Sequence, residues 1–136
     1  MKKLLLLAVV VALSGCGTII TVPIDSTPAS KDKATLILYN EQGFTDDFQL
    51  VVDKQAVGHI SPETPLKVQL EPGSHEMYIE VPQFIHVVIR RITVETFEAG
   101  KVYYRKLVVR IIPFASDVRI EPSDKITSYT VRSHNQ

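Results

Sequence analysis

The residues with the clearest chemical potential in this chain are its histidines and a pair of adjacent aspartates. The histidines are His59, His75, His86 and His134. A zinc site needs three or four ligands that converge on the metal, and no two of these histidines are two or four residues apart. His75 falls on the apolar side of an alternating stretch, which favours a position at the edge of a core. Asp46 and Asp47 would point to opposite faces of a strand, and beside Gly43 they are typical of a solvated turn.

Motifs for nucleophilic catalysis and for phosphate binding do not occur in the sequence. There is no G-x-S-x-G elbow, and the only G-x-G is Gly15-Cys16-Gly17 in the amino-terminal region. The 15 Lys and Arg balance the 15 Asp and Glu, so no net positive field favours nucleic acid. The sequence therefore predicts a protein that is not an enzyme, with no metal, no cofactor and no nucleic-acid partner.

Cys16, the only cysteine, stands at the end of a distinctive amino terminus. Two lysines follow Met1, residues 4–13 are all Leu, Ala or Val, and Leu13-Ser14-Gly15-Cys16 completes the pattern. This order closely resembles the signal of bacterial lipoproteins. The resemblance implies that residues 1–15 are a signal peptide and that Cys16 is lipidated with diacylglycerol and palmitate-type acyl chains. An uncleaved membrane helix is the alternative, but the apolar run is about half of the ~20 residues that span a bilayer.

Residues 16–33 are predicted to form a lipidated tether. This segment holds two prolines and a cluster of Ser, Thr, Asp and Lys, without a sustained period. The alternative is that Thr18-Ile19-Ile20 pairs as a short strand. Gly17 rather than Asp follows the cysteine, which by resemblance to lipoproteins of double-membrane bacteria implies the periplasmic side of the outer membrane. A single cysteine allows no intramolecular disulfide in that oxidising compartment.

Apolar and polar residues alternate through most of residues 34–132, which is typical of strands with one buried face. The predicted strands are residues 34–39, 48–52, 56–60, 66–70, 75–81, 87–97, 102–112, 117–120 and 127–131. Pro72 and Gly73 suit a type II turn, which predicts a hairpin between residues 66–70 and 75–81. No window has a clean helical period. The predicted fold class is therefore all-β, a single small antiparallel sandwich or barrel over residues 34–132.

Three short motifs resemble the pattern of PEGA-type domains, which are small β-sandwiches. The motifs are Val52-Asp53-x-x-x-Val57-Gly58, Thr64-Pro65-Leu66 and Leu70-x-Pro72-Gly73-x-His75. The run from Gly100 to Arg105 is similar to a related family of bacterial lipoproteins of unknown function. The chain departs from the pattern at Lys54, where the turn usually has Gly. The resemblance implies a non-enzymatic β-sandwich of the cell envelope, and it carries over no catalytic residue.

Basic and aromatic residues concentrate on two neighbouring predicted strands and define a candidate binding face. Its members are Arg91, Tyr103, Tyr104, Arg105, Lys106 and Arg110. Such a face would bind an anionic glycan, lipopolysaccharide or an acidic protein. The alternative is a solvated sheet face on which Glu95 and Glu98 pair with the basic residues across strands.

Two apolar runs, residues 84–89 and 111–114, lack the alternation of apolar and polar residues seen in the other predicted strands. Burial on both sides of a strand would explain them, and the alternative is an exposed patch for a partner or a membrane. The sequence as a whole predicts a lipid-anchored envelope lipoprotein whose β-sandwich binds or scaffolds. Its expected partners are the membrane, through Cys16, and an envelope protein or glycan. The alternatives are a glycan- or peptidoglycan-binding module and an accessory of an envelope enzyme.

Overall fold

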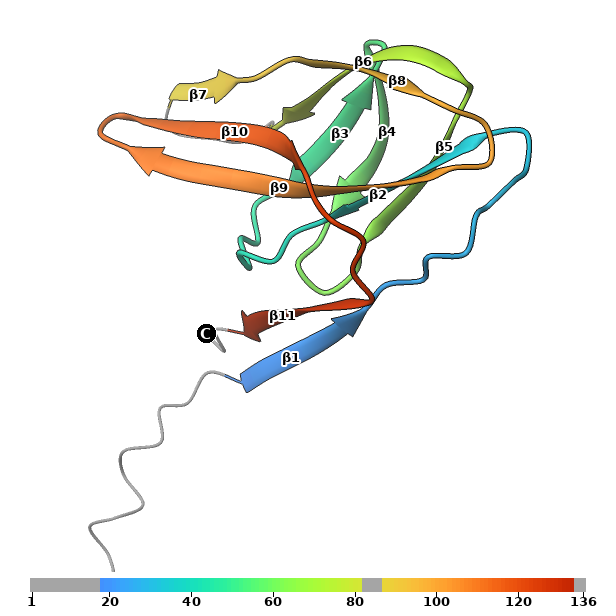
Figure 1. Ribbon diagram of the computed structural model, residues 1–136. Helices are drawn as coiled ribbons and strands as arrows, with labels where there is room; N and C mark the ends of the chain where they lie inside the picture. The colour runs from blue at the N-terminus through green and yellow to red at the C-terminus, as the bar shows by residue number, and fades with distance from the viewer. Residues whose placement is uncertain (1–17, 82–86, 134–136) are drawn as a thin grey trace, which may run out of the picture.

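The protein is built from β-strands arranged in three sheets (Figure 1). The computed structural model describes residues 18–81 and 87–133, so the predicted signal peptide, Cys16, residues 84–86 and His134 lie outside the described residues. The strands are β1 (Thr18–Pro23), β2 (Ala34–Tyr39), β3 (Phe48–Val52), β4 (Gln55–Ile60), β5 (Leu66–Leu70), β6 (Gly73–Glu80), β7 (Val87–Arg90), β8 (Thr93–Phe97), β9 (Val102–Ile112), β10 (Ala115–Pro122) and β11 (Ser128–Ser133). Within these two ranges, no helix is long and apolar enough to cross a membrane. The predicted all-β sandwich is confirmed.

Two of the sheets pack together and enclose the main core. One has five strands in the order β5-β2-β9-β10-β7, and the other has four in the order β4-β3-β6-β8. Alternate residues of the strands point between the sheets, which is how a period of two buries one face. The largest side chains enclosed in this core are Leu36, Leu38, Phe48, Leu50, Met77, Ile79, Phe97 and Leu107.

Two pairings in the five-stranded sheet are parallel, a feature that the predicted antiparallel sandwich does not include. β2 pairs in parallel with β9, and β10 pairs in parallel with β7. The other two pairings of this sheet are antiparallel. Parallel neighbours need a long crossover connection. Here the connection between β2 and β9 passes repeatedly through the four-stranded sheet.

Two predicted arrangements of strands are wrong, because the chain changes sheets where no change was expected. β5 pairs with β2, whereas β6 pairs with β3 and β8, so the predicted hairpin between residues 66–70 and 75–81 does not form. β6 nevertheless begins at a glycine of positive φ, Gly73 at 128°. The predicted strand over residues 87–97 divides at Arg91 and Ile92 into β7 of one sheet and β8 of the other.

The β3–β4 hairpin turns at Asp53 and Lys54, where the sequence departs from the PEGA-type pattern. Val52 lies opposite Gln55, so Asp53 and Lys54 alone form the turn. Their φ angles are positive, 49° and 68°. Positive φ at both central residues is the mark of the type I′ turn, whose twist matches that of the strands. Lys54 thus adopts the left-handed conformation that Gly usually adopts, and the hairpin forms without a glycine at this position.

The segment predicted as a tether contains a strand, which corrects the boundary drawn at residue 34. β1 pairs with β11 over six residue pairs, from Thr18 opposite Ser133 to Pro23 opposite Ser128. The alternative of a short strand at Thr18-Ile19-Ile20 is the correct one. The two strands are called the β1–β11 ribbon below.

The β1–β11 ribbon covers the outer face of the five-stranded sheet and encloses a second core (Figure 1). Its buried members are Val22, Ile24, Ile37, Tyr39, Tyr104, Tyr129 and Val131. The rings of Tyr39 and Tyr129 lie 5.1 Å apart, and the Tyr129 hydroxyl donates a hydrogen bond to the Pro62 carbonyl at 2.8 Å. Because β2 contributes side chains to both cores, all six of its residues are buried.

Shortening Ile37, on the outer face of β2, should reduce the free energy of unfolding by about 2–5 kcal/mol, as for other core residues. The physical reason is that the ribbon leaves this side chain only 1% exposed. Urea unfolding of Ile37→Ala measures the loss. The control is Val57→Ala, at a 38% exposed position of β4, where a small change is expected. A loss in Ile37→Ala no larger than in the control would show that the ribbon does not cover β2.

Candidate functional site

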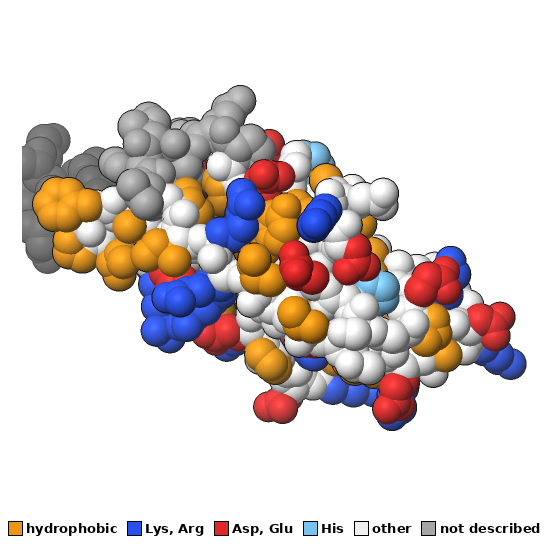
Figure 2. All heavy atoms as spheres, turned by 90° about the horizontal axis from the view of Figure 1, so that it is seen from above, with side chains coloured by type: hydrophobic (Ala, Val, Ile, Leu, Met, Phe, Trp, Pro, Cys, Tyr) orange, Lys and Arg blue, Asp and Glu red, His pale blue; other side chains and the backbone are white. Residues whose placement is uncertain are grey.

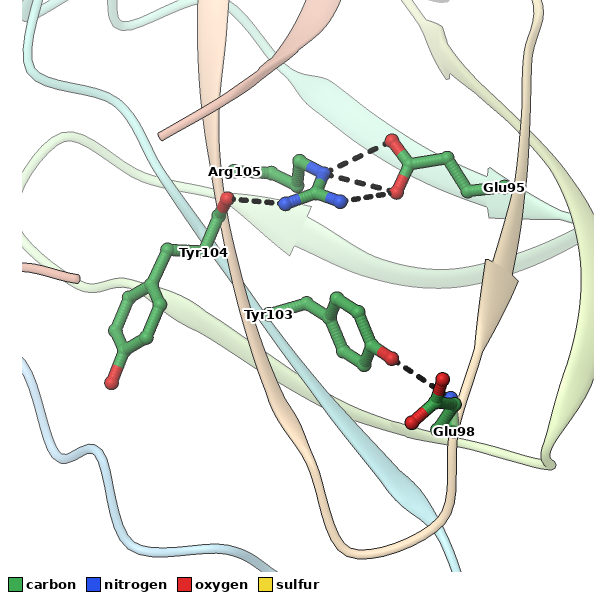
Figure 3. A network of polar contacts seen from close by, with 5 residues as sticks. All are labelled: Glu95, Glu98, Tyr103, Tyr104 and Arg105. Carbon is green, nitrogen blue, oxygen red and sulfur yellow. Dashed lines mark hydrogen bonds and ion pairs between the residues drawn. The ribbon is translucent and has the colours of Figure 1, made fainter. Parts of the chain in front are cut away.

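The residues of the predicted binding face do not share one surface. Tyr103 and Arg105 lie on the side of β9 that faces the other sheet, and Tyr104 points the opposite way (Figure 3). Tyr104 is buried in the second core. Lys106 and Arg110 follow the alternation of Tyr104 and lie on the outer face. The prediction of a single binding face is therefore wrong.

Arg105 forms an ion pair with Glu95 between the two sheets (Figure 3). The two side chains are only 13% and 17% exposed. Arg105 Nε donates to the two carboxylate oxygens at 3.0 and 3.1 Å, and its Nη2 also contacts Oε2. Nη1 donates to the carbonyl oxygen of Tyr104 at 2.7 Å. Charge-assisted bonds of this kind hold the guanidinium in place, so Arg105 ties β9 to β8 and is not presented to a ligand.

The alternation of β8 explains why a carboxylate lies inside. Glu95 and Phe97 point toward the interior. Val94, which alternates with them, points outward and is 65% exposed. The predicted alternative, in which Glu95 pairs with a basic residue across strands, is correct for Arg105. The pair lies in the interior rather than on a solvated face, because both residues are in phase with core side chains.

Tyr103 extends the same interior cluster toward the β8–β9 turn. Its ring packs edge-on against Phe97, with 4.8 Å between the ring centroids. Its hydroxyl accepts a hydrogen bond from the backbone N–H of Glu98 at 2.9 Å (Figure 3). The Arg105 guanidinium lies 5.7 Å from the centre of the Tyr103 ring, within the range of a cation–π contact. Tyr103 therefore packs between the two sheets and contributes to their contact.

The other basic residues lie on the outer side of the five-stranded sheet together with acidic residues. Arg91 Nε donates to Asp117 Oδ1 at 3.0 Å, and this hydrogen bond holds the pKa of Asp117 below its usual value. Arg110 lies opposite Asp117 in the β9–β10 register, and Lys106 Nζ is 3.6 Å from Glu41. Acidic side chains thus lie among the basic ones on this surface, and three arginines, Arg91, Arg110 and Arg119, lie close enough to Asp117 to lower its pKa.

A second polar contact joins the β3–β4 turn to the β5–β6 link through His75. His75 Nδ1 is 2.5 Å from Asp53 Oδ2, and its Nε2 is 2.7 Å from the carbonyl oxygen of Glu71. Both ring nitrogens face acceptors, which favours the doubly protonated ring. The hydrogen bond with Asp53 raises the pKa of His75, and the same bond lowers the pKa of Asp53. Two residues that carry the PEGA-type resemblance are thus in contact.

A shallow hollow near the end of β4 gathers several polar groups. It is lined in part by Asp46, Asp47, His59, Ser61 and Glu63. His59 Nδ1 is 2.6 Å from Asp47 Oδ1, while Ser61 Oγ accepts a hydrogen bond from the N–H of Glu63. Histidine and serine are therefore engaged with different neighbours. In the part of the chain that the structure describes, no three His, Cys, Asp or Glu side chains could hold a metal ion.

Exposed apolar side chains gather at the tip of the β9–β10 hairpin. Ile111 is 75% exposed, Ile112 is 41% exposed and Phe114 is 94% exposed. Phe114 also has a positive φ of 69°, which is unusual for a bulky side chain. Figure 2 shows hydrophobic side chains at this end of the molecule. Burial of residues 111–114 on both sides is therefore wrong, and the alternative of an exposed patch is correct.

Neither a family model nor a curated protein matches the chain. The PEGA-type resemblance therefore stays a prediction. Two features of the chain have the clearest chemical consequences, the Leu13-Ser14-Gly15-Cys16 sequence and the exposed tip of the β9–β10 hairpin.

Two features escaped the sequence analysis, the interior position of the Arg105–Glu95 pair and the contact of Asp53 with His75. The first had a usable signal, since Arg105 is in phase with Tyr103 and places its side chain on the inner face of β9. The second had none. Alternation predicts which face of a strand a residue occupies, but it does not predict which turns and links between strands lie next to each other.

Removing Glu95 alone should be more harmful than removing the whole ion pair. Glu95→Ala should lower the free energy of unfolding by about 3 kcal/mol, because it leaves the Arg105 charge unpaired between the sheets. The double variant Glu95→Leu with Arg105→Leu should recover most of this loss, since no charge is left unpaired. Urea unfolding of the three proteins measures both effects. Equal losses in the single and double variants would contradict this account.

Stability should decline as the pH rises through the folded-state pKa of His75. That pKa is raised above 6.5, so the stabilisation is complete below 6.5 and is lost as the ring deprotonates. Asp53 acts in the opposite sense. Its pKa is lowered from 3.8, so its contribution is complete above 3.8 and is lost as the pH falls through the lowered value.

The melting temperature measured across both ranges should therefore be highest between them. The variant His75→Gln should lack the decline on the alkaline side. A decline of the same size in both proteins would show that another group is responsible.

Proposed function

We propose that this protein is a lipid-anchored lipoprotein of the bacterial envelope, held on the periplasmic side of the outer membrane, with a non-catalytic β-sandwich that binds or scaffolds. The observation that carries the proposal is the Leu13-Ser14-Gly15-Cys16 motif after a short apolar run. Lipid on Cys16 would provide the membrane contact, since more than one acyl chain gives a stable anchor.

The fold supports this arrangement, because the first strand that the structure describes begins close to Cys16 in the sequence. β1 starts at Thr18, two residues after Cys16. Two residues span at most about 7 Å, so the anchor would join the β1–β11 ribbon almost directly. The ribbon is in turn fixed to the sandwich by the second core. Such an anchor would hold the whole domain at the membrane surface.

A binding or scaffolding role agrees with how the polar residues are used. Arg105 and Glu95 satisfy each other between the sheets, and His75 joins two loops. The Arg and Tyr side chains of the predicted binding face are divided between the two faces of β9, so they do not form the single surface that the glycan-binding alternative assumed. The exposed apolar tip is the remaining surface of unusual composition.

The lipid anchor is tested by the mass of the mature protein in a double-membrane bacterium. The mature chain should begin at Cys16 and carry the added mass of diacylglycerol on its thiol and of an acyl chain on its new amino terminus. Cys16→Ala should keep residues 1–15 and gain no lipid mass. A wild-type protein that retains Met1 would sink the proposal.

Gly17→Asp provides the matched control for sorting. This variant should be cleaved and lipidated like the wild type, because the cysteine motif is intact. By resemblance to other lipoproteins, it should remain in the inner membrane rather than reach the outer membrane. Separation of the two membranes on a density gradient measures this, and identical distributions for the two proteins would contradict the outer-membrane assignment.

A further inference from the structure

We propose that the tip of the β9–β10 hairpin inserts into the membrane that carries the lipid of Cys16. The apolar tip is defined as residues 111–114, which are Ile111, Ile112, Pro113 and Phe114. The proposal rests on the lipid anchor proposed above and adds a second contact, one that orients the domain on the bilayer. The occupant of the apolar tip is therefore the acyl and headgroup boundary of a lipid leaflet.

The length of chain between the anchor and the fold is the first argument. Cys16 precedes Thr18 by two residues, so its Cα lies within about 7 Å of the start of β1. A tether of that length cannot hold the domain away from the bilayer. Whichever end of the molecule contains the start of β1 must therefore face the membrane.

A series of contacts through three segments connects the start of β1 to the strand that leads into the apolar tip. Ile19, near the start of β1, lies opposite Arg132 of β11. The carbonyl oxygen of Arg132 is 3.6 Å from the position that a Cβ on Gly43 would occupy. The neighbouring Gln42 accepts from the N–H of Val109 at 2.7 Å and donates to its carbonyl at 3.3 Å. Val109 lies two residues before the apolar tip. In Figure 1 the start of β1, low in the view, and the hairpin tip, high in the view, both lie toward the left of the molecule.

The chemistry of this end fits a lipid surface. Ile19, near the start of β1, is 66% exposed, and Figure 2 shows hydrophobic side chains gathered where the hairpin ends. Arg110 and Arg132 are exposed beside these apolar residues. Apolar groups enter the boundary of the acyl region, while arginines reach the phosphates of the headgroups. Without a bilayer, the exposed side chains of the apolar tip would stay in contact with water, which is unfavourable.

Phe114 shows the clearest mismatch with an aqueous surface. It combines 94% exposure with a positive φ of 69°. A bulky residue in the left-handed region costs free energy, and the exposed ring gains nothing from the protein core. Unfavourable backbone conformations of this kind cluster at binding sites, where another interaction offsets them. Insertion of the ring into lipid would supply that interaction.

The chain contains no tryptophan, so a single introduced tryptophan reports its own surroundings. Phe114→Trp is placed in the full lipidated protein and reconstituted into vesicles of phosphatidylethanolamine and phosphatidylglycerol, with and without bromine on the acyl chains. We expect its emission to shift to shorter wavelength on the vesicles and to lose intensity with the brominated lipid. The control is Val94→Trp, at a 65% exposed position of β8. Its emission should keep the aqueous wavelength and intensity.

The outcomes separate this inference from the lipid anchor. Flotation with the vesicles together with quenching at position 114 supports insertion. Flotation without quenching, or equal quenching at positions 114 and 94, overturns insertion and leaves the anchor in place. A mature mass without lipid overturns the anchor and this inference with it. Protection of position 114 from an aqueous quencher before vesicles are added would show that protein covers the apolar tip, and would also overturn insertion.

Discussion

Burial of both faces of β2 is the constraint on which the rest of this structure depends. One face contributes Leu36 and Leu38 to the core between the two main sheets, and the other contributes Ile37 and Tyr39 to the core under the ribbon. Each fully buried aliphatic side chain stabilises by about 1.5–3 kcal/mol relative to exposure. A strand with no solvated face needs a cover on each side. The four-stranded sheet supplies one cover, and the two ends of the chain, paired as the β1–β11 ribbon, supply the other.

Polar contacts between the elements complement this apolar framework by fixing how the layers meet. The ion pair of Arg105 and Glu95 joins the central strand of one sheet to the edge strand of the other. His75 joins a hairpin turn to a link between sheets through its two ring nitrogens. Apolar packing is tolerant of small displacements, whereas bonds between charged groups require a defined geometry. These contacts therefore specify the relative position of the sheets more than they add to total stability.

The alternation of side chains predicted most of the strands and the fold class, because the period of two depends only on local geometry. The same pattern could not assign strands to sheets. β5 and β6 read as a hairpin, since Pro72 and Gly73 suit a turn, but turns between sheets use the same residues. The parallel pairing of β2 with β9 is also invisible locally, as the partners are distant in sequence. For the candidate site, an exposed patch at residues 111–114 is one of two alternatives that the sequence allows. The separation of Tyr103 from Tyr104 follows from alternation alone.

The pairing of β1 with β11 has a consequence for how the protein is made. A ribosome produces β11 long after β1, so Thr18 has no strand partner until Ser133 has been made. Contacts this distant in sequence form slowly, because the chain between them must first be ordered. Until then, the outer surface of β2 and the ring of Tyr104 have no cover. The nascent chain therefore exposes an apolar strip until β11 has been made, and exposed apolar surface of this kind promotes aggregation.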